Sequence, residues 1–378
     1  MLLYISGSFP DNQEGIASGA KVLLDAMLGL VDKDEIILLT TDIPIVSEYV
    51  KQTVFIKYRL LKNWKVTLEN INTVYAILDK YPITAIHMEY PGDLYGRTFF
   101  ASFLPWFIKK YNHKKRKHIT FNVRLHEFTR SRFLRKVAII PILLFSDAIY
   151  IPSLKDRKAA SIFAGKKVKP TRIGTNIKVA SDKLIVESKK IISYFGSVYP
   201  GKGIERMLKI WQSINKECAN EEYEFKIIGD IGTEPDNHFA DYHKQVWQWI
   251  NQYGLADKIT VTGYISDEEV SKAIQNTTVA TLPYEDGLTL RRGSFLAYLS
   301  HGIPIVTSKG DVEAQNLFQG HEGISMVESD AEFIKNTLRY THLSETERRL
   351  IHEDNKHLSD HFQWDRIAKR FLDDYKII

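Results

Sequence analysis

Short apolar runs alternate with amphipathic helical stretches along the chain, and this alternation restricts the possible fold more than any other feature. In the first half the apolar runs lie at residues 2–6, 35–40, 84–89, 119–125 and 148–153. After about residue 188 the pattern begins again, with runs at 190–197, 223–230, 258–264, 278–284 and 303–308. Apolar strands joined by helices are typical of parallel sheets covered on both faces. The sequence therefore predicts an α/β fold with two Rossmann-like, doubly wound parallel-sheet domains.

The length of the chain agrees with two domains. Its 378 residues, 44% of them hydrophobic, provide enough apolar material for two cores. The polar segment 179–190 is the natural linker, so the predicted domains are 1–178 and 179–360. Ligands of open parallel sheets bind outside the carboxyl ends of the strands. We therefore expect one cleft to be lined by the loops that follow Ile5, Leu125, Phe195, Ile228, Thr262 and Leu282.

The charge distribution and the single cysteine further narrow the kinds of protein that the chain can be. The single cysteine, Cys218, excludes an internal disulfide framework and cysteine-based zinc sites. The first ten residues lack the basic start of a signal peptide, and no apolar run approaches membrane-spanning length, so a cytoplasmic protein is expected. Residues 1–175 carry a net charge of +12 and the remainder −7.

The densest basic stretch is 109–118, directly after the aromatic and apolar run 99–108. Such a surface can rest on anionic lipid headgroups at the inner face of a membrane or bind a polyanion. A solvated helix end that leads into a polar loop explains the same run equally well. Nucleic acid is not among the expected partners.

Residues 281–308 bring together what an anionic diphosphate needs. A loop with Gly287 leads to Arg291 and Arg292, and Gly293 and Ser294 follow at the expected start of a helix. Free N–H groups at a helix start bind phosphate, and the macrodipole there disfavours uncompensated arginines. The segment is therefore interpreted as a phosphate cradle, and the alternative is an ordinary loop with two solvated arginines.

A second glycine loop, residues 195–205, follows the first strand of the second half. Lys202 in this loop could neutralise phosphate and stabilise a departing nucleoside diphosphate. Both loops follow strands of one predicted sheet, so together they form a two-loop clamp, whereas alone Lys202 could be a surface lysine in a turn. In the first half, the loop 6–19 with Gly15 enters a helix and could approach a ligand, although it lacks GxGxxG spacing.

These segments resemble the donor domain of a GT-B glycosyltransferase, in particular retaining glycosyltransferase family 4. The resemblance rests on FGSVYPGKGIERML, KIIGD, VTGYISDEEVSKAIQNTTVATLPYEDG and SHGIPIVTS in the second half. GSFPDNQEGIASGAKVLLDAML, NVRLHEF, FSDAIYIPS and RIGTNI agree less specifically in the first half. Residues 361–378 are similar to the last family helix, which packs back toward the first domain.

The resemblance implies a role for particular positions. Lys202 and the backbone of Gly293 and Ser294 would bind the donor diphosphate, Arg292 would help to stabilise the leaving group, and His126 would point at the transferred sugar. The implied donor-binding residues are Gly15, Ser197, Gly203, Gly263, Tyr264, Ile265, Thr289, Leu290, Arg291, Gly293 and Ser294.

The sequence departs from the family pattern at two places. Ser197 occupies the position of a family arginine, so Arg291 or Arg292 could substitute for it. Thr289 and Ala297 occupy the positions of two family glutamates that hold the donor sugar and ribose. The identity of the donor is therefore open.

The sequence thus predicts a glycosyltransferase that moves a sugar from a UDP-sugar or GDP-sugar to a hydroxyl of a glycan or lipid-linked acceptor, with retention. The resemblance implies that Lys202, Arg292 and the N–H groups of the helix start stabilise the leaving diphosphate instead of a metal, so no cofactor and no metal are expected. Asp32 and Asp34 have DxD spacing, but they lie in a polar turn rather than at a strand end and are rejected as a metal site. Two alternatives stay open: a sugar-nucleotide epimerase or hydrolase of the same fold, and a noncatalytic protein that binds nucleotides or anionic polymers.

Overall fold

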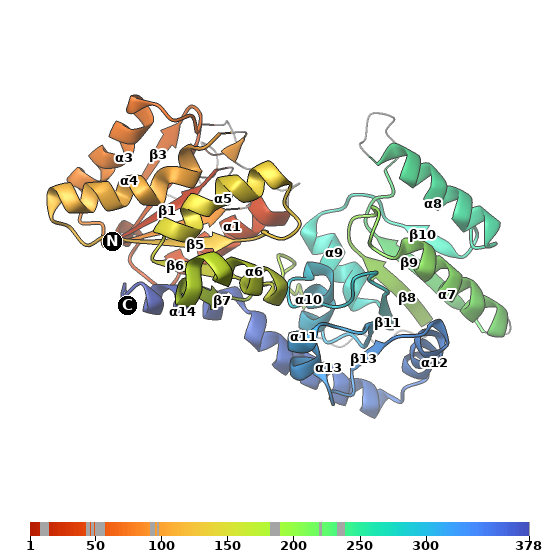
Figure 1. Cartoon of the computed structure of the whole chain (residues 1–378). Helices are drawn as coiled ribbons and strands as arrows, with labels where there is room; N and C mark the ends of the chain where they lie inside the picture. The colour runs from red at the N-terminus through yellow and green to blue at the C-terminus, as the bar shows by residue number, and fades with distance from the viewer. Residues whose placement is uncertain are drawn as a thin grey trace. The chain divides into compact units, whose positions relative to one another are not determined.

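A computed structural model describes residues 1–7, 15–42, 46, 49, 57–90, 95–96, 98–181, 190–218, 221–232 and 239–377. The chain divides into two compact units (Figure 1). Unit 1 comprises Met1–Gly174 and Gln363–Ile378, and unit 2 comprises Thr175–Phe362. Most of the predicted linker, residues 182–189, lies outside the described residues.

Unit 1 is built on a parallel sheet of seven strands in the order β3-β2-β1-β4-β5-β6-β7. The strands are β1 (Leu2–Ser6), β2 (Ile36–Thr41), β3 (Lys57–Leu61), β4 (Ala85–Tyr90), β5 (Thr120–Leu125), β6 (Ala148–Ile151) and β7 (Val168–Pro170). Every residue of the central strands β1 and β4 is buried, which explains why most of their residues are apolar.

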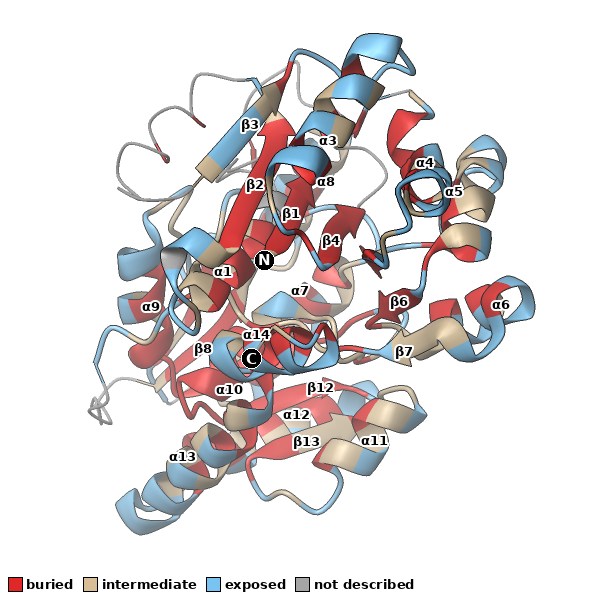
Figure 2. Ribbon diagram, turned by 90° about the vertical axis from the view of Figure 1, so that its left-hand side faces the viewer, coloured by how far each residue is buried: buried red, intermediate tan, exposed pale blue. Residues whose placement is uncertain are grey.

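Helices cover both faces of this sheet (Figure 2). One face packs against α3 (Leu68–Lys80), α4 (Phe100–Lys115), α5 (Phe133–Phe145) and α6 (Leu154–Ala164). The other face packs against α1 (Gly15–Leu28) and α14 (Trp364–Asp374). The last helix, α14, buries Ile367, Ala368, Phe371 and Leu372, which recur at helical spacing and form one apolar stripe.

Unit 2 contains a parallel sheet of six strands in the order β10-β9-β8-β11-β12-β13. The strands are β8 (Lys190–Phe195), β9 (Tyr223–Ile228), β10 (Ile259–Val261), β11 (Val279–Leu282), β12 (Ile305–Ser308) and β13 (Ile324–Val327). The helices are α7 (Ile204–Glu217), α8 (Ala240–Gln252), α9 (Asp267–Gln275), α10 (Gly293–Ser300), α11 (Val312–Phe318), α12 (Asp330–Thr341) and α13 (Glu345–Ser359). The predicted fold class, two doubly wound parallel-sheet domains, is confirmed.

The strand order places a topological switch point in each unit. In unit 2 the chain runs outward from β8 to β9 and β10, and then returns to β11 on the other side of β8. Ligands of such sheets bind beyond the carboxyl ends of the two strands at the switch point. In unit 2 those strands are β8 and β11, and in unit 1 they are β1 and β4.

Candidate functional site

The loop after β8 is shaped by glycines with positive φ. Gly196, Gly201 and Gly203 have φ angles of 135°, 89° and 76°, where other residues are strained. The loop is held from two sides, because the buried Tyr194 hydroxyl donates to the Ser197 carbonyl at 3.2 Å and His243 of α8 contacts the Val198 carbonyl at 2.8 Å. The predicted donor-binding residue Ser197 is exposed at the bend of this loop.

Gly203 joins this loop to the loop after β11. The residue is buried, and a Cβ placed on it would overlap the carbonyl oxygen of Pro283, the first residue after β11. A Cβ on Gly196 would lie 3.7 Å from the Cβ of Ser294 in α10. The backbones of the two glycine-containing loops therefore approach each other at the switch point of unit 2.

Lys202 lies between these glycines and is half-buried. Its ammonium nitrogen lies 4.7 Å from the centre of the Tyr199 ring, and its backbone N–H donates to the Tyr199 carbonyl at 3.3 Å. Tyr199 in turn stacks on Phe239, with ring centres 5.6 Å apart. An aromatic ring attracts a cation without neutralising its charge. The Lys202 ammonium group can therefore still pair with an anion.

The loop between β11 and α10 holds Arg292 inward. Arg292 forms an ion pair with Asp286, and its guanidinium lies 4.4 Å from the centre of the Tyr284 ring. Within the described residues its Nε is buried without a hydrogen-bond partner, as is the Oγ1 of Thr289. Two such atoms in one short loop are unusual, because buried polar atoms are nearly always hydrogen-bonded.

Tyr284 organises the start of α10. Its hydroxyl lies 2.6 Å from the Ser294 hydroxyl and hydrogen-bonds with the backbone of Phe295. Burial raises the pKa of Tyr284 to about 12, although the Ser294 hydrogen bond and the nearby Arg292 charge oppose the rise. Gly293, at the first position of α10, is exposed. The tyrosine thus fixes the helix start through Ser294 and Phe295, while Gly293 stays open to solvent.

The remaining predicted positions of this segment are half-buried. They are Thr289, Leu290 and Arg291. The loop is braced from β12, because a Cβ on Gly287 would overlap the Lys309 carbonyl oxygen and the Asp311 N–H donates to the Leu288 carbonyl at 2.9 Å. Ala297, which occupies one of the family glutamate positions, is buried in α10. That position therefore faces the core of unit 2 and offers no polar group to a ligand.

The segment Gly263, Tyr264 and Ile265 follows β10 and connects to the same region through β9. The Gly229 N–H, after β9, donates to the Thr262 hydroxyl at 3.0 Å, and a Cβ on Gly229 would lie 2.6 Å from the Gly196 carbonyl oxygen. Tyr264 is 76% exposed. A large aromatic side chain left in solvent beside a glycine loop is suited to stack on a planar ring.

In unit 1, His126 follows β5 and contacts a buried carboxylate that the sequence interpretation missed. Its Nε2 lies 2.5 Å from Oε2 of Glu89, which is fully buried in the neighbouring strand β4. The other carboxylate oxygen of Glu89 accepts from Arg124 at 3.2 Å and lies 2.9 Å from Nε2 of His87. Arg124 is directly opposite Glu89 in the strand register.

Glu89 is a buried anion with a buried counter-ion. Burial favours the protonated carboxyl, but the Arg124 charge and the hydrogen bonds from His126 and His87 hold the pKa of Glu89 well below its usual range. Burial lowers the pKa of His87, so this ring is neutral. The last helix closes the cluster, since Tyr375 lies 2.7 Å from Nδ1 of His87 and Arg124 lies 5.2 Å from the Trp364 ring centre.

A sequence signal for Glu89 exists. His87 and Glu89 stand two residues apart in an apolar run, which places two polar side chains on one face of a buried strand. The partners that satisfy them come from residues 124, 126 and 375, and no local pattern identifies those. Gly15, the other predicted site residue of unit 1, begins α1, whereas residues 8–14 of its loop lie outside the described residues.

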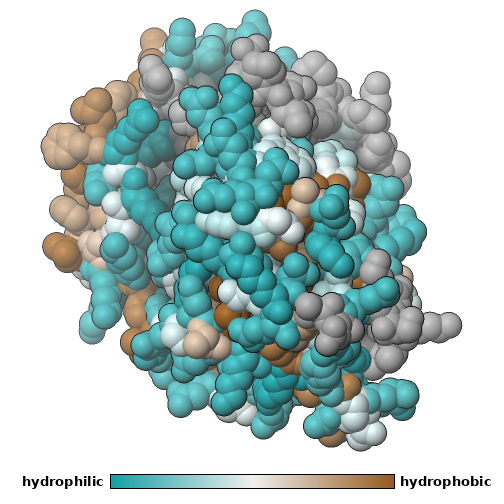
Figure 3. Space-filling model, turned by 90° about the vertical axis from the view of Figure 1, so that its right-hand side faces the viewer, coloured by the Kyte–Doolittle hydropathy of each residue, from teal (hydrophilic) through white to brown (hydrophobic). Residues whose placement is uncertain are grey.

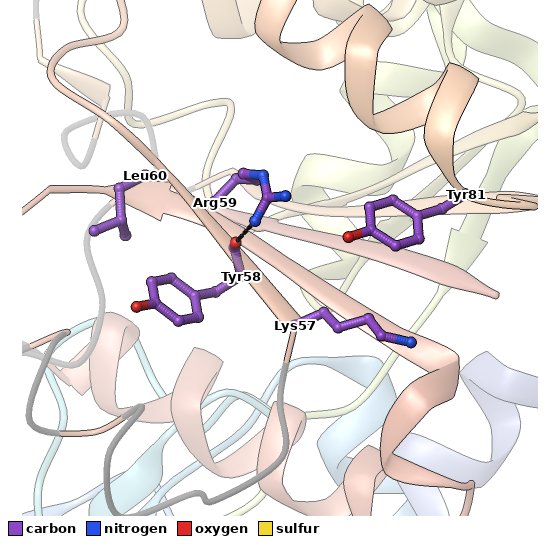
Figure 4. A pocket seen from close by; sticks show the side chains of 5 residues that line it. All are labelled: Lys57, Tyr58, Arg59, Leu60 and Tyr81. Atoms are coloured by element: carbon purple, nitrogen blue, oxygen red, sulfur yellow. Dashed lines mark hydrogen bonds between the residues drawn. The ribbon is translucent and has the colours of Figure 1, made fainter.

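One further hollow, of about 380 Å³, lies along the edge strand β3 (Figure 4). It is lined by Lys57, Tyr58, Arg59, Leu60 and Tyr81. Lys57 already pairs with Asp34 at 3.0 Å, and Arg59 donates to the Tyr58 carbonyl at 2.7 Å. The hollow therefore follows the outer edge of the sheet along β3, and its cations already have partners. Among the described residues no group of three or more His, Cys, Asp or Glu is arranged to hold a metal ion.

Comparisons with known proteins match the fold of the whole chain and the family of one domain. Residues 189–342 match the family described as "Glycosyl transferases group 1". No curated protein sequence matches the chain. Among solved structures, the chain is similar to a glycosyltransferase from Rickettsia africae, with 13% identity, a TM-score of 0.75, and 99% of this chain and 97% of that chain covered.

Two other structures are also similar over their whole length. Anabaena HepE in complex with UDP has 14% identity, a TM-score of 0.70 and complete coverage of both chains, and HepE is also described in complex with UDP-glucose. Sucrose-phosphate synthase from Thermosynechococcus elongatus has 14% identity, a TM-score of 0.70, and covers 99% of this chain and 98% of its own. At this identity the likeness concerns the fold. Residues 189–342 thus form a glycosyl transferases group 1 domain, in a chain whose two domains have the GT-B fold.

Proposed function

We propose that this protein is a glycosyltransferase that moves a sugar from a nucleoside-diphosphate donor to a hydroxyl of a glycan or lipid-linked acceptor. The observation that carries the proposal is the contact between the Lys202 loop and the start of α10 at the switch point of unit 2. A helix start and a lysine on neighbouring loops provide N–H dipoles and a positive charge for one diphosphate. The match of residues 189–342 to the glycosyl transferases group 1 family supports the reaction class.

The donor is proposed to be a UDP-sugar or a GDP-sugar. The complexes of HepE with UDP and UDP-glucose favour uridine as the base. In this arrangement the exposed Tyr264 lies on the loop assigned to the base, and the Gly293 and Ser294 N–H groups face the diphosphate. Thr289 and Ala297 in place of the family glutamates leave the choice of sugar to other contacts.

The chemistry proposed is transfer with retention. The acceptor oxygen forms a bond to the anomeric carbon on the face from which the diphosphate oxygen departs, and the hydroxyl proton passes to that oxygen. Lys202 and the α10 N–H groups stabilise the charge that grows on the leaving diphosphate, the task for which some enzymes use a metal ion. His126, held by Glu89, is proposed to contact the transferred sugar.

A transfer assay with Lys202→Ala tests this assignment. We expect its kcat/KM with a UDP-sugar or GDP-sugar to fall by about 100-fold or more, the loss typical of removing one group that stabilises transition-state charge. Activity measured in EDTA should equal activity measured without it. The matched control is Lys216→Ala, an exposed lysine at the other end of α7, which should leave kcat/KM unchanged.

The outcome also separates the alternative functions. Loss of donor sugar at full rate without any acceptor would favour an epimerase or hydrolase. Tight nucleotide binding with no sugar released or transferred would favour a noncatalytic binder. Equal activity of Lys202→Ala and Lys216→Ala would contradict the site assignment.

A further inference from the structure

Three successive helices of unit 1 expose large apolar side chains on their outer side. The side chains that define this α4–α6 surface are Phe103 of α4, Phe133, Leu134, Val137 and Leu144 of α5, and Ile162 of α6. Phe133 and Leu134 are each 78% exposed and Ile162 is 81% exposed. An isolated exposed apolar residue is ordinary, but a group on adjoining helices marks an interaction surface.

Apart from Arg135 and Lys136 in its first turn, helix α5 is apolar on both its inner and its outer side. Ile139, Ile142 and Leu143 pack into the core of unit 1, whereas Phe133, Val137 and Leu144 recur on the outer side. A helix of this kind is normally covered on both sides. With 13 residues, α5 is too short to cross a bilayer, and within the described residues no helix is long and apolar enough to do so. It has the length and amphiphilic setting of a segment that lies in a membrane interface.

The border of this surface is basic. Residues 98–170 contain 17 Lys and Arg against 3 Asp and Glu. Lys167 donates to the Leu144 carbonyl at the end of α5 at 2.8 Å, and burial together with the nearby Lys109 charge lowers its pKa. Cations from α4 and from the turn after α6 therefore meet beside the apolar side chains, and an anionic partner would relieve their repulsion.

The aromatic run that the sequence singled out contributes less than expected. Phe100, Leu104 and Ile108 of α4 are buried against the sheet. The exposed apolar area instead centres on α5, which carries Phe133, Leu134, Val137 and Leu144. Figures 2 and 3 view the molecule from opposite sides. The three helices lie along one edge in Figure 2, and hydrophobic side chains gather along the corresponding edge in Figure 3.

We propose that the α4–α6 surface docks on an anionic lipid bilayer. Phe133, Leu134 and Ile162 would enter the boundary between headgroups and acyl chains, while lysines such as Lys155 and Lys158 contact the headgroups. A second copy of the chain fits the surface less well. In a symmetric pair each patch faces itself, so the two basic borders would meet with few acidic residues to compensate them.

Vesicle sedimentation tests the proposal without donor or acceptor, so its result does not depend on sugar transfer. The wild-type chain should sediment with vesicles of phosphatidylcholine mixed with phosphatidylglycerol and far less with phosphatidylcholine alone. Phe133→Ser combined with Leu134→Ser should weaken the partition coefficient at least about tenfold, because two large apolar side chains lose their transfer from water. Lys155→Gln combined with Lys158→Gln should weaken it by roughly the same factor, and more at low salt.

The matched control is Leu68→Ser combined with Leu350→Ser. These leucines are 79% and 63% exposed on α3 and α13, so the change removes exposed apolar area outside the α4–α6 surface. The control should bind vesicles as the wild type does. Unchanged binding of the Phe133→Ser/Leu134→Ser variant, or equal binding to neutral vesicles, would overturn the proposal. A wild-type dimer that this variant dissociates, with no vesicle binding, would identify a second copy as the occupant instead.

Discussion

Gly203→Ala should lower the free energy of unfolding by about 2–4 kcal/mol and abolish tight nucleotide binding. The backbone of Gly203 has φ of 76°, which costs an alanine roughly 1 kcal/mol. In addition, the new Cβ meets the Pro283 carbonyl oxygen, a backbone atom that cannot turn away, and overpacking of this kind costs about 1–3 kcal/mol. The only relief is to separate the two loops that form the proposed diphosphate site. Urea denaturation and nucleotide titration measure the two effects.

Gly201→Ala is the matched control for that change. Gly201 lies in the same loop with φ of 89°, but a Cβ placed there has no described atom within 4 Å. It should therefore lose only about 1 kcal/mol of stability and keep most of its nucleotide affinity. Equal losses in the two variants would mean that the contact with Pro283 does not hold the loops together.

Glu89→Gln should destabilise the protein by about 3–5 kcal/mol, because the change leaves Arg124 as a buried charge without its counter-ion. Transfer should fall as well, since His126 loses the carboxylate that orients its ring. Urea denaturation and a transfer assay at neutral pH provide the two measurements. Glu127→Gln, at an exposed neighbour of His126, should change neither.

A second substitution separates the charge effect from a loss of packing. Glu89→Gln combined with Arg124→Met removes both charges and should recover much of the lost stability, because a buried pair replaced as a whole costs far less than a pair broken on one side. Stability of Glu89→Gln within about 0.5 kcal/mol of the wild type would contradict the ion-pair account.

The sequence was sufficient for the fold because parallel strands buried on both faces read as continuous apolar runs, as in residues 2–5 and 36–39. It also singled out the Lys202 loop and the Gly293 helix start as candidates, since each combines glycine with phosphate-binding chemistry at a strand end, and the structure brings these two loops close together. Each of these patterns lies within a short segment, so it can be recognised without knowing how the rest of the chain folds.

Contacts between distant segments could not be predicted in the same way. Arg292 contacts Asp286 and Tyr284 instead of projecting into solvent. These contacts depend on the path of the loop, which the sequence does not reveal. The same holds for Glu89, whose partners come from another strand and from the chain's last residues. The aromatic run of α4 suggested an exposed surface, but most of its residues lie on the side of the helix that packs against the core.

Hydrogen–deuterium exchange with and without a nucleotide tests the location of the donor most directly. UDP or GDP, whichever raises the melting temperature, should slow exchange in peptides that cover residues 196–205 and 286–296, because the ligand occupies their N–H groups and ties the two loops together. Peptides from α3 and from α12 should exchange as they do in the free protein. A nucleotide that stabilises the protein but leaves both loops unprotected would contradict the proposal that the donor diphosphate binds where β8 and β11 end.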